Sequence, residues 1–417
     1  MMDGLKPSER KILFACFKRN LRNEIKVAQL SGYTSEVSSY HHGEVSLSQT
    51  ITALGQDYVG SNNINLLLPL GQFGTRYNGI KGAASPRYIF TNLNPITRKI
   101  FMENDDNLLL YNVEEGLKIE PVWYAPIIPM VLVNGAEGIG TGWSTSVPEF
   151  NPIELAQNLI KKINGEEMNK ILPWYKGFSG KITESIDNKG NKNYTATGII
   201  KINEETECVE ITELPIHEFT RDYKSFLEKN HVDNKDYVGK RDFVIEDIKE
   251  YHIDNKISFV LKLTPESFKE IRYNSNDDLI KIFKLSTSIP TTNMVLFDSK
   301  NKIKKYNNIE EIINEFYDVR LDFYNQRKKY LLSKLGFNLE RNKNKKKFIN
   351  LVLEGELPFK GTKNKKEVFK LLKNKNLSSL NELKKNIKKL FKSNQLKLLL
   401  LKVIMRMRMK MKIWIII

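Results

Sequence analysis

The chain has 417 residues, of which 41% are hydrophobic, and its formal net charge is +17. This length and composition predict a soluble globular protein of two or three domains and exclude a chain that is disordered overall. The two cysteines, Cys16 and Cys208, exclude a disulfide framework and a cysteine zinc site. We find no signal peptide and no apolar run of membrane-spanning length.

The basic excess predicts a polyanionic partner, with nucleic acid as the first choice. A merely solvated basic surface is the alternative, because Lys- and Asn-rich segments late in the chain contribute much of the excess. Charge alone therefore leaves both interpretations open.

The N-terminal region predicts a winged-helix module. Residues 7–22 have apolar positions at helical spacing, with Ser8 as the expected cap and cations toward the last turn. Shorter helical patterns at 27–30 and 46–58 enclose the polar stretch SSYHHGE, and a Gly-rich segment follows. Three short helices and a glycine-rich wing place one helix against DNA and let the wing touch the backbone.

The stretch AASPRYIFT places Arg87 directly before Tyr88, after Pro86 and a run of glycines. A Tyr on such a permissive loop could act as a nucleophile, and a strand Tyr packed on a core is the alternative. Consecutive side chains of a regular strand point to opposite faces, so Arg87 and Tyr88 can share one phosphate only if the backbone is irregular. The chain contains no GxxxxGK[ST] motif and therefore no P-loop.

Residues 120–147 predict buried strands in PVWYAPIIPMVLV and then the string GAEGIGTGWST. This string does not meet the GxGxxG dinucleotide fingerprint. Ile139 lies between Gly138 and Gly140, so it could approach stacked bases closely and bend a duplex. An ordinary core Ile beside a tight turn is the alternative.

The second half of the chain predicts alternating short strands and helices and then one long helix. A hairpin is expected around residues 188–192, strands at EITELPI and ISFVLKL, and a helix at HEFTRDYKSFLEKN. From Asn308, apolar residues step by four and three, which predicts a coiled-coil arm, and an amphipathic helix packed within the chain is the alternative. The Met-Arg-Met-Lys alternation at 405–412 fits no helix pattern, and we interpret the last twenty or so residues as the product of a shifted reading frame.

Several of these motifs together resemble the breakage-reunion region of eukaryotic-type DNA topoisomerase II: MDGLKPSERKILF, YHHGE, GQFGTRYNG, SPRYIFT and NGAEGIGTGWST. The resemblance is dense over residues 3–148 and fails beyond about 335. It implies an α+β, multidomain fold with a winged-helix domain (1–126), a mixed α/β tower domain (127–300) and a partial coiled-coil arm (301–395), before the aberrant tail (396–417). The family continues on both sides of this region, so we expect a fragment without the ATPase and TOPRIM domains.

The resemblance also implies roles for individual residues. Tyr88 matches the nucleophile that forms a phosphotyrosine. Arg87 and His42 match residues at the scissile phosphate, although a His pair such as His41 and His42 is more often structural. DNA contacts are implied for Lys6, Arg10 and Ile139, of which Lys6 and Arg10 add positive potential and Ile139 matches the wedge between base pairs.

The implied activity is transient double-strand DNA cleavage and religation in the nucleus by a homodimer bound to double-stranded DNA. Mg2+ and ATP are the implied cofactors, both held by domains that this chain lacks, since it contains no Asp-x-Asp sequence. The expected enzyme is therefore a DNA topoisomerase whose isolated fragment is inactive. A non-catalytic DNA-binding fragment, or the product of a broken gene, is the alternative. A winged-helix regulator without cleavage is a third possibility, but it would not need the Arg87-Tyr88 pair.

Overall fold

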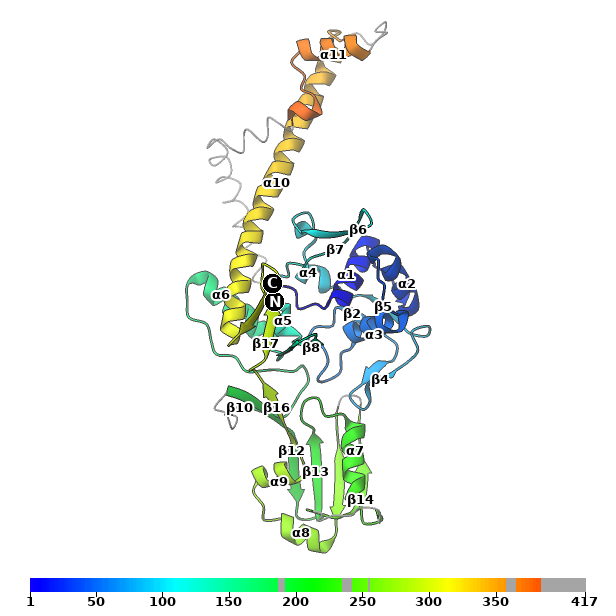
Figure 1. Ribbon diagram of the computed structural model, residues 1–417, viewed down its shortest axis with the longest axis vertical. Helices are drawn as coiled ribbons and strands as arrows, with labels where there is room; N and C mark the ends of the chain where they lie inside the picture. The colour runs from blue at the N-terminus through cyan, green and yellow to red at the C-terminus, as the bar shows by residue number, and fades with distance from the viewer. Residues whose placement is uncertain (187–191, 235–241, 254–255, 358–364, 384–417) are drawn as a thin grey trace. The chain divides into compact units, whose positions relative to one another are not determined.

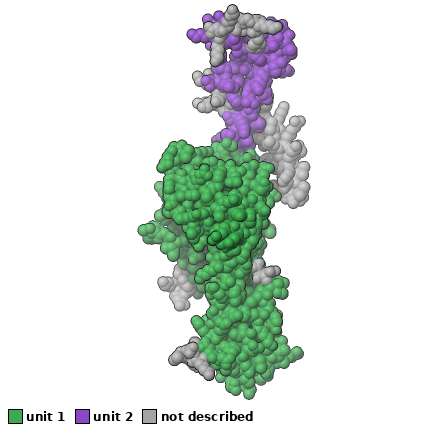
Figure 2. Space-filling view, turned by 90° about the vertical axis from the view of Figure 1, so that its right-hand side faces the viewer, with its two compact units in different colours: residues 1–321 green, residues 322–417 purple. Residues whose placement is uncertain are grey.

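The computed structural model describes residues 1–186, 192–234, 242–253, 256–357 and 365–383 (Figure 1). The chain divides into two compact units, Met1–Leu321 and Asp322–Ile417, which Figure 2 distinguishes by colour. The division falls within the long helix α10 (Ile309–Leu353). The predicted tail at 396–417 lies outside the described residues.

Three helices begin the first unit: α1 (Pro7–Arg19), α2 (Val27–Ser38) and α3 (Glu44–Gly55). The predicted apolar face of α1 is confirmed, because Ile12 and Cys16 are fully buried. The predicted cap at Ser8 is wrong: α1 starts at Pro7, and the backbone N–H of Lys6 donates to Glu9 Oε2 at 2.8 Å. A proline is favoured at the first helical position because the N–H that it lacks would have no partner there.

Small antiparallel sheets follow the three helices. Strand β5 (Phe90–Leu93) lies between β1 (Ile25–Lys26) and β2 (Leu67–Leu70). The β3–β4 hairpin, residues 73–83, is called the wing below. The other paired strands of this part are β3 (Phe73–Thr75) with β4 (Gly79–Ala83), β6 (Tyr111–Glu114) with β7 (Leu117–Pro121), and β8 (Ala136–Gly140) with β9 (Trp143–Val147).

The strands predicted after Pro121 are absent from the structure. Strand β7 ends at Pro121, no strand covers 122–129, and Met130–Val133 forms the short helix α5. Pro126 and Pro129 explain the difference, since a proline has no N–H to donate to a strand ladder. The segment is nevertheless apolar and largely buried, so the prediction of burial was correct while that of strands was wrong. Two further short helices precede it: α4 (Thr97–Ile100) and the 3-10 helix η1 (Glu103–Asp105).

Residues 152–290 hold two further sheets with helices beside them (Figure 1). The larger, called the tower sheet below, has the order β12-β13-β15-β14. The predicted hairpin is confirmed by the pairing of Ile186 with Lys192, although its tip lies outside the described residues. The elements are α6 (Pro152–Asn164), β10 (Lys181–Ile186), β11 (Lys192–Thr197), β12 (Ile199–Asn203), β13 (Cys208–Glu213), α7 (Thr220–Lys229), β14 (Ile245–Glu250), β15 (Phe259–Leu263), α8 (Pro265–Ile271), α9 (Asn276–Ile282) and β16 (Ser286–Pro290).

The tower sheet encloses its own apolar core. Alternate side chains of β13, Val209 and Ile211, are fully buried, as the period of a strand requires. The rings of Phe243 and Phe283 stack with centroids 4.3 Å apart, and the Tyr223 hydroxyl donates to the Phe283 carbonyl oxygen at 2.8 Å. This core is continuous across the tower sheet and the helices packed against it.

The hairpin of β17 (Met294–Phe297) and β18 (Ile303–Tyr306) leads into α10, and α11 (Lys365–Asn374) follows in the second unit. The long predicted helix is confirmed. Its first turns bury Ile312 and Phe316 within the first unit, so there the helix packs inside its own chain. The coiled-coil arm stays a prediction for the part of α10 in the second unit.

Candidate nucleic-acid interface

Tyr88 lies on an exposed turn. Its side chain is 71% exposed, so the alternative of a Tyr packed on a core is wrong. Residues 84–89 belong to no strand, and the Tyr88 N–H donates to the Ser85 carbonyl oxygen at 2.9 Å. The irregular backbone that the sequence required is therefore present. Arg87 is also exposed, and its guanidinium lies 5.5 Å from the centre of the Tyr88 ring.

The turn that carries Tyr88, which we call the nucleophile loop (84–89), is held at both ends by backbone hydrogen bonds. The N–H groups of Val27 and Ala28, at the start of α2, donate to Ile89 O at 3.0 Å and Pro86 O at 3.1 Å. These are among the first amides of a helix, which have no partner within it. On the other side Ala84 N–H donates to Gln72 O at 2.9 Å, so the loop is fixed to α2 and to the start of the wing.

His42 lies exposed just before α3, with its ring edge-on to Tyr40 at 5.4 Å between centroids. Its neighbour His41 is used differently, since His41 Nε2 lies 2.8 Å from Glu114 Oε1 in the β6–β7 hairpin. The structural role expected for a His pair thus falls to His41. His42 presents its imidazole beside the N-terminus of α3, where the partial positive charge of a helix favours an anion.

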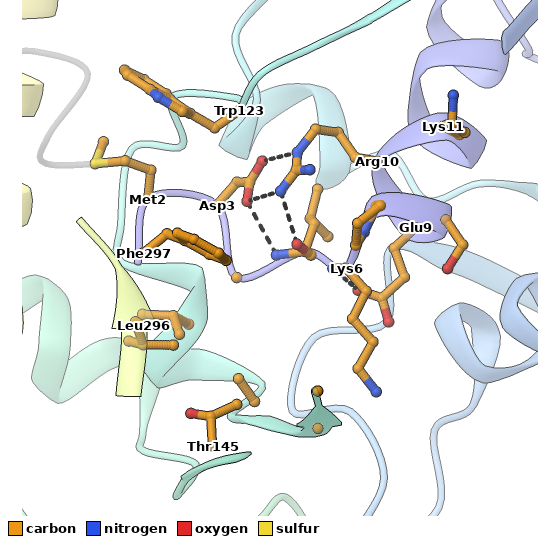
Figure 3. A pocket seen from close by; sticks show the side chains of 18 of the residues that line it. Met2, Asp3, Lys6, Glu9, Arg10, Lys11, Trp123, Thr145, Leu296 and Phe297 are labelled. Carbon is orange, nitrogen blue, oxygen red and sulfur yellow. Dashed lines mark hydrogen bonds and ion pairs between the residues drawn. The ribbon is translucent and has the colours of Figure 1, made fainter. Parts of the chain in front are cut away.

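A groove of about 1650 Å³ brings four of the predicted residues together: Lys6, Arg10, His42 and Ile139 all line it. Tyr88 and Arg87 are not among its lining residues. Figure 3 shows the side near the start of α1, with Lys6 just before the helix and Arg10 in its first turn. The chain segments that meet here include the N-terminal residues, the YHH stretch, the β8–β9 hairpin and residues 295–303.

Arg10 is bound within the protein. Its Nε donates to Asp3 Oδ2 at 2.7 Å, and its Nη2 donates to Asp3 Oδ1 at 3.0 Å and to Leu5 O at 2.8 Å (Figure 3). Asp3 Oδ2 also accepts the N–H of Tyr124 at 2.9 Å. Because this carboxylate neutralises the guanidinium, Arg10 is less available to an external anion than the exposed Lys6. The sequence could not distinguish the two cations.

Ile139 projects into solvent from the β8–β9 hairpin with 94% of its side chain exposed, so the alternative of a core Ile is wrong. It pairs with Ser144, and the tight turn at the tip contains Gly142 with φ of +77°. The hairpin is attached to the segment before β17, since Ser146 N–H donates to Asn293 O at 2.8 Å. An apolar side chain held this way can enter a base step.

Trp143, which no sequence motif singled out, is 56% exposed on the same hairpin, next to the residue that pairs with Ile139. An exposed Trp beside an exposed Ile is a stronger sign of a binding surface than either residue alone. The signal was available in the string GIGTGW, where only the turn residues separate the two side chains.

Within the described ranges, no group of three or more His, Cys, Asp or Glu side chains is arranged to hold a metal ion. Over the same part of the chain, no helix combines the length and apolarity that crossing a membrane requires.

The chain thus combines an exposed Tyr-Arg pair on an anchored turn, a protruding apolar hairpin and a basic excess in a mixed α/β fold, features that fit a nucleic-acid-binding class of protein. The model of the DNA gyrase/topoisomerase IV A-subunit family matches residues 1–411, and the chain belongs to this family. It is 50% identical over 357 residues to DNA topoisomerase 2 of Arabidopsis thaliana, covering 86% of this chain and 24% of that protein. It is 49% identical over 375 residues to a DNA topoisomerase 2 of Caenorhabditis elegans, covering 90% of this chain and 24% of that protein.

A solved structure also resembles the chain: the DNA-binding, cleavage and re-ligation domain of Plasmodium falciparum topoisomerase II. The TM-score is 0.82 with 44% sequence identity, over 92% of this chain and 50% of that one. The fold class is thereby confirmed as mixed helix and strand. The chain spans about a quarter of the length of the topoisomerase 2 relatives from Arabidopsis thaliana and Caenorhabditis elegans.

Proposed function

We propose that this chain is the DNA-cleaving and religating segment of a type IIA topoisomerase, with Tyr88 as the nucleophile. The observation that carries the proposal is the 71% exposed Tyr88 beside Arg87 on a turn whose two ends are hydrogen-bonded. The homologues are DNA topoisomerases 2, and the similar solved structure is named for DNA binding, cleavage and re-ligation. Residues 1–126 would form its winged-helix domain and 127–300 its tower.

The proposed reaction is a transesterification. The Tyr88 phenol oxygen attacks a backbone phosphorus, the bond from phosphorus to a sugar oxygen breaks, and the phenol proton is lost as that oxygen gains one. The reverse step restores the strand. A phenol is mostly protonated at neutral pH, so it needs a nearby proton acceptor and cations on the phosphate oxygens.

The other residues then have distinct tasks. Arg87 stays ionised and can bind two phosphate oxygens at once, so it stabilises charge that grows in the transition state. His42 hydrogen-bonds the phosphate or relays a proton, and Lys6 adds positive potential in the groove. Ile139 enters a base step, which exchanges unstacking energy for a bent duplex.

In this proposal, other parts of the enzyme bind Mg2+ and ATP. The described residues contain no carboxylate cluster that could hold a metal ion, and the sequence contains no P-loop. Magnesium supplies stabilisation of the departing sugar oxygen when bound. The chain by itself would therefore bind DNA without cleaving it. The complete enzyme would act as a nuclear homodimer, since a double-strand break needs two tyrosines on one duplex.

The test is a chimera in which the matching region of Arabidopsis thaliana DNA topoisomerase 2 is replaced by this chain. The chimera should form a DNA–protein adduct that survives denaturation, and Tyr88→Phe should abolish it. Arg87→Ala and His42→Ala should slow adduct formation while DNA affinity changes little, because both act mainly in the transition state. An adduct that persists in the Tyr88→Phe chimera would refute the assignment.

A further inference from the structure

The tip of the wing is attached to the tower sheet through a buried ion pair. The Arg76 guanidinium lies against Glu213, the last residue of β13, and both side chains are 4% exposed. Arg76 Nη2 also donates to the Leu214 carbonyl oxygen at 3.0 Å, 138 residues away in sequence. A buried ion pair is stable only if the remaining hydrogen-bonding capacity of both groups is satisfied.

Glu213 meets that condition. Its Oε2 accepts the Ser179 N–H at 3.0 Å and the Ser179 hydroxyl at 2.7 Å, and its Oε1 accepts the Leu214 N–H at 3.0 Å. Hydrogen bonds from Ser179 and Leu214 therefore fix the orientation of the Glu213 carboxylate, and the guanidinium of Arg76 binds to the side of the carboxylate that remains accessible. Arg76 inserts into a site that the tower builds.

The backbone of the wing tip also caps a tower helix. Helix α7 has no side-chain cap, and its first amides would otherwise be unsatisfied. Thr220 N–H donates to Arg76 O at 3.3 Å, and Arg221 N–H donates to Tyr77 O at 3.1 Å. The wing thus supplies the acceptors that the N-terminus of α7 lacks.

Close packing completes the attachment. Gly79 has φ of +61°, and a Cβ placed on it would lie 2.6 Å from Cζ of Phe219. The position therefore needs glycine for both its conformation and its space. Tyr77 lies beside His252 of the tower, with ring centroids 6.4 Å apart.

The wing leads directly to the nucleophile loop. Phe73 pairs with Ala83 and Thr75 pairs with Gly79, so the two strands of the wing move together. Ala83 is followed by the nucleophile loop, and the Ala84 N–H is held by Gln72 at the base of the wing. The wing therefore provides a continuous path of chain and backbone hydrogen bonds from the Arg76–Glu213 pair to the segment that carries Tyr88.

We propose that Arg76 is a positioning residue for Tyr88: it locks the wing tip to the tower, so that the position of the tower sets that of the nucleophile loop. The inference rests on the proposed function, in which Tyr88 is the nucleophile. In that case, a bent DNA duplex that contacts the part of the chain containing the tower sheet would shift the wing, and the wing would align the Tyr88 hydroxyl. Cleavage would then depend on the DNA bend.

Hydrogen exchange of the full chain, followed by mass spectrometry, tests the link without any cleavage. Arg76→Met combined with Glu213→Gln removes the ion pair without leaving a buried charge. The Gln oxygen still accepts from Ser179, while the hydrogen bond from the Leu214 N–H is lost. Exchange should rise roughly tenfold or more in peptides covering 214–222 and also 84–91, because a hydrogen-bonded charged pair contributes at least that factor to local opening. Lys262→Ala, which breaks the exposed pair with Glu246 on the same sheet, is the matched control and should change neither peptide.

An increase in 214–222 with 84–91 unchanged would overturn the proposal, since Arg76 would then serve only tower packing. If the double variant does not fold, Gly79→Ala tests the same link by forcing the wing tip from Phe219, with the same two outcomes. In the chimera described above, the double variant should lower the rate of adduct formation with DNA affinity unchanged, and an unchanged rate would also refute the positioning role. An adduct that persists in Tyr88→Phe would refute the proposed function while leaving the exchange result intact.

Discussion

Removal of the carboxylate of Asp105 should destabilise the first unit strongly. Arg320, near the end of the buried part of α10, places its Nη1 2.7 Å from Asp105 Oδ2 and 3.0 Å from Ala125 O. The side chains are 4% and 3% exposed. Asp105→Asn keeps the shape of the side chain but takes this counter-charge from the guanidinium in a site that water does not reach.

The expected magnitude follows from burial. Breaking a buried ion pair by removing one partner costs roughly 3–5 kcal/mol, mostly because the remaining charge stays desolvated. Asp106 is the matched control: it pairs with Arg98 at 2.9 Å, but the two side chains are 27% and 28% exposed. Asp106→Asn should cost less than about 1 kcal/mol, because solvent screens a pair that water can reach.

Urea unfolding of the full chain, followed by circular dichroism, measures both variants. With a slope of about 3 kcal/mol per molar urea, Asp105→Asn should lower the midpoint by roughly 1 M or more, and Asp106→Asn by about 0.3 M or less. Equal shifts for the two variants would show that burial does not govern the strength of these pairs. The link between α10 and η1 would then have to rest on apolar packing instead.

Three further outcomes are expected. Burial raises the pKa of Glu149 well above its ordinary value, and its Oε2 has no hydrogen-bond partner among the described residues, so the folded state holds a proton that the unfolded state releases. The free energy of unfolding should therefore fall as pH rises above the ordinary pKa of a Glu side chain. Melting temperatures should show that Glu149→Gln is more stable than the native chain at about pH 8 and equally stable near pH 4. A gain in stability that is independent of pH would contradict this reasoning. Ile139→Ala should leave a bound duplex straighter in end-to-end fluorescence transfer, and an unchanged bend would exclude the wedge. Binding of duplex DNA should weaken steeply between roughly 50 and 200 mM salt, and a constant affinity over that range would remove the electrostatic argument.

Local patterns in the sequence predicted what depends on neighbours along the chain. The apolar spacing of α1, a strand at EITELPI that overlaps β13, and the hairpin around 188–192 were predicted, because helix and strand periods are properties of consecutive residues. The strands predicted around Pro126 were the exception. The apolar composition favoured strands there, although a backbone interrupted by prolines could not form a ladder of hydrogen bonds. The irregular turn at Tyr88 was predicted for the same local reason, from Pro86 and the glycines before it.

The tertiary structure alone decided which polar groups meet. Arg10 and Lys6 are both cations near the start of α1, yet of these two Asp3 pairs with Arg10. Arg76 and Glu213 belong to segments far apart in sequence, and nothing in either local pattern indicates the partner. Whether a charge is exposed, neutralised or buried depends on chain segments brought together by folding, and pairing energies depend on that burial. The exposure of Ile139 was likewise decided by the tertiary structure, because an apolar side chain is exposed only where no other chain segment packs against it.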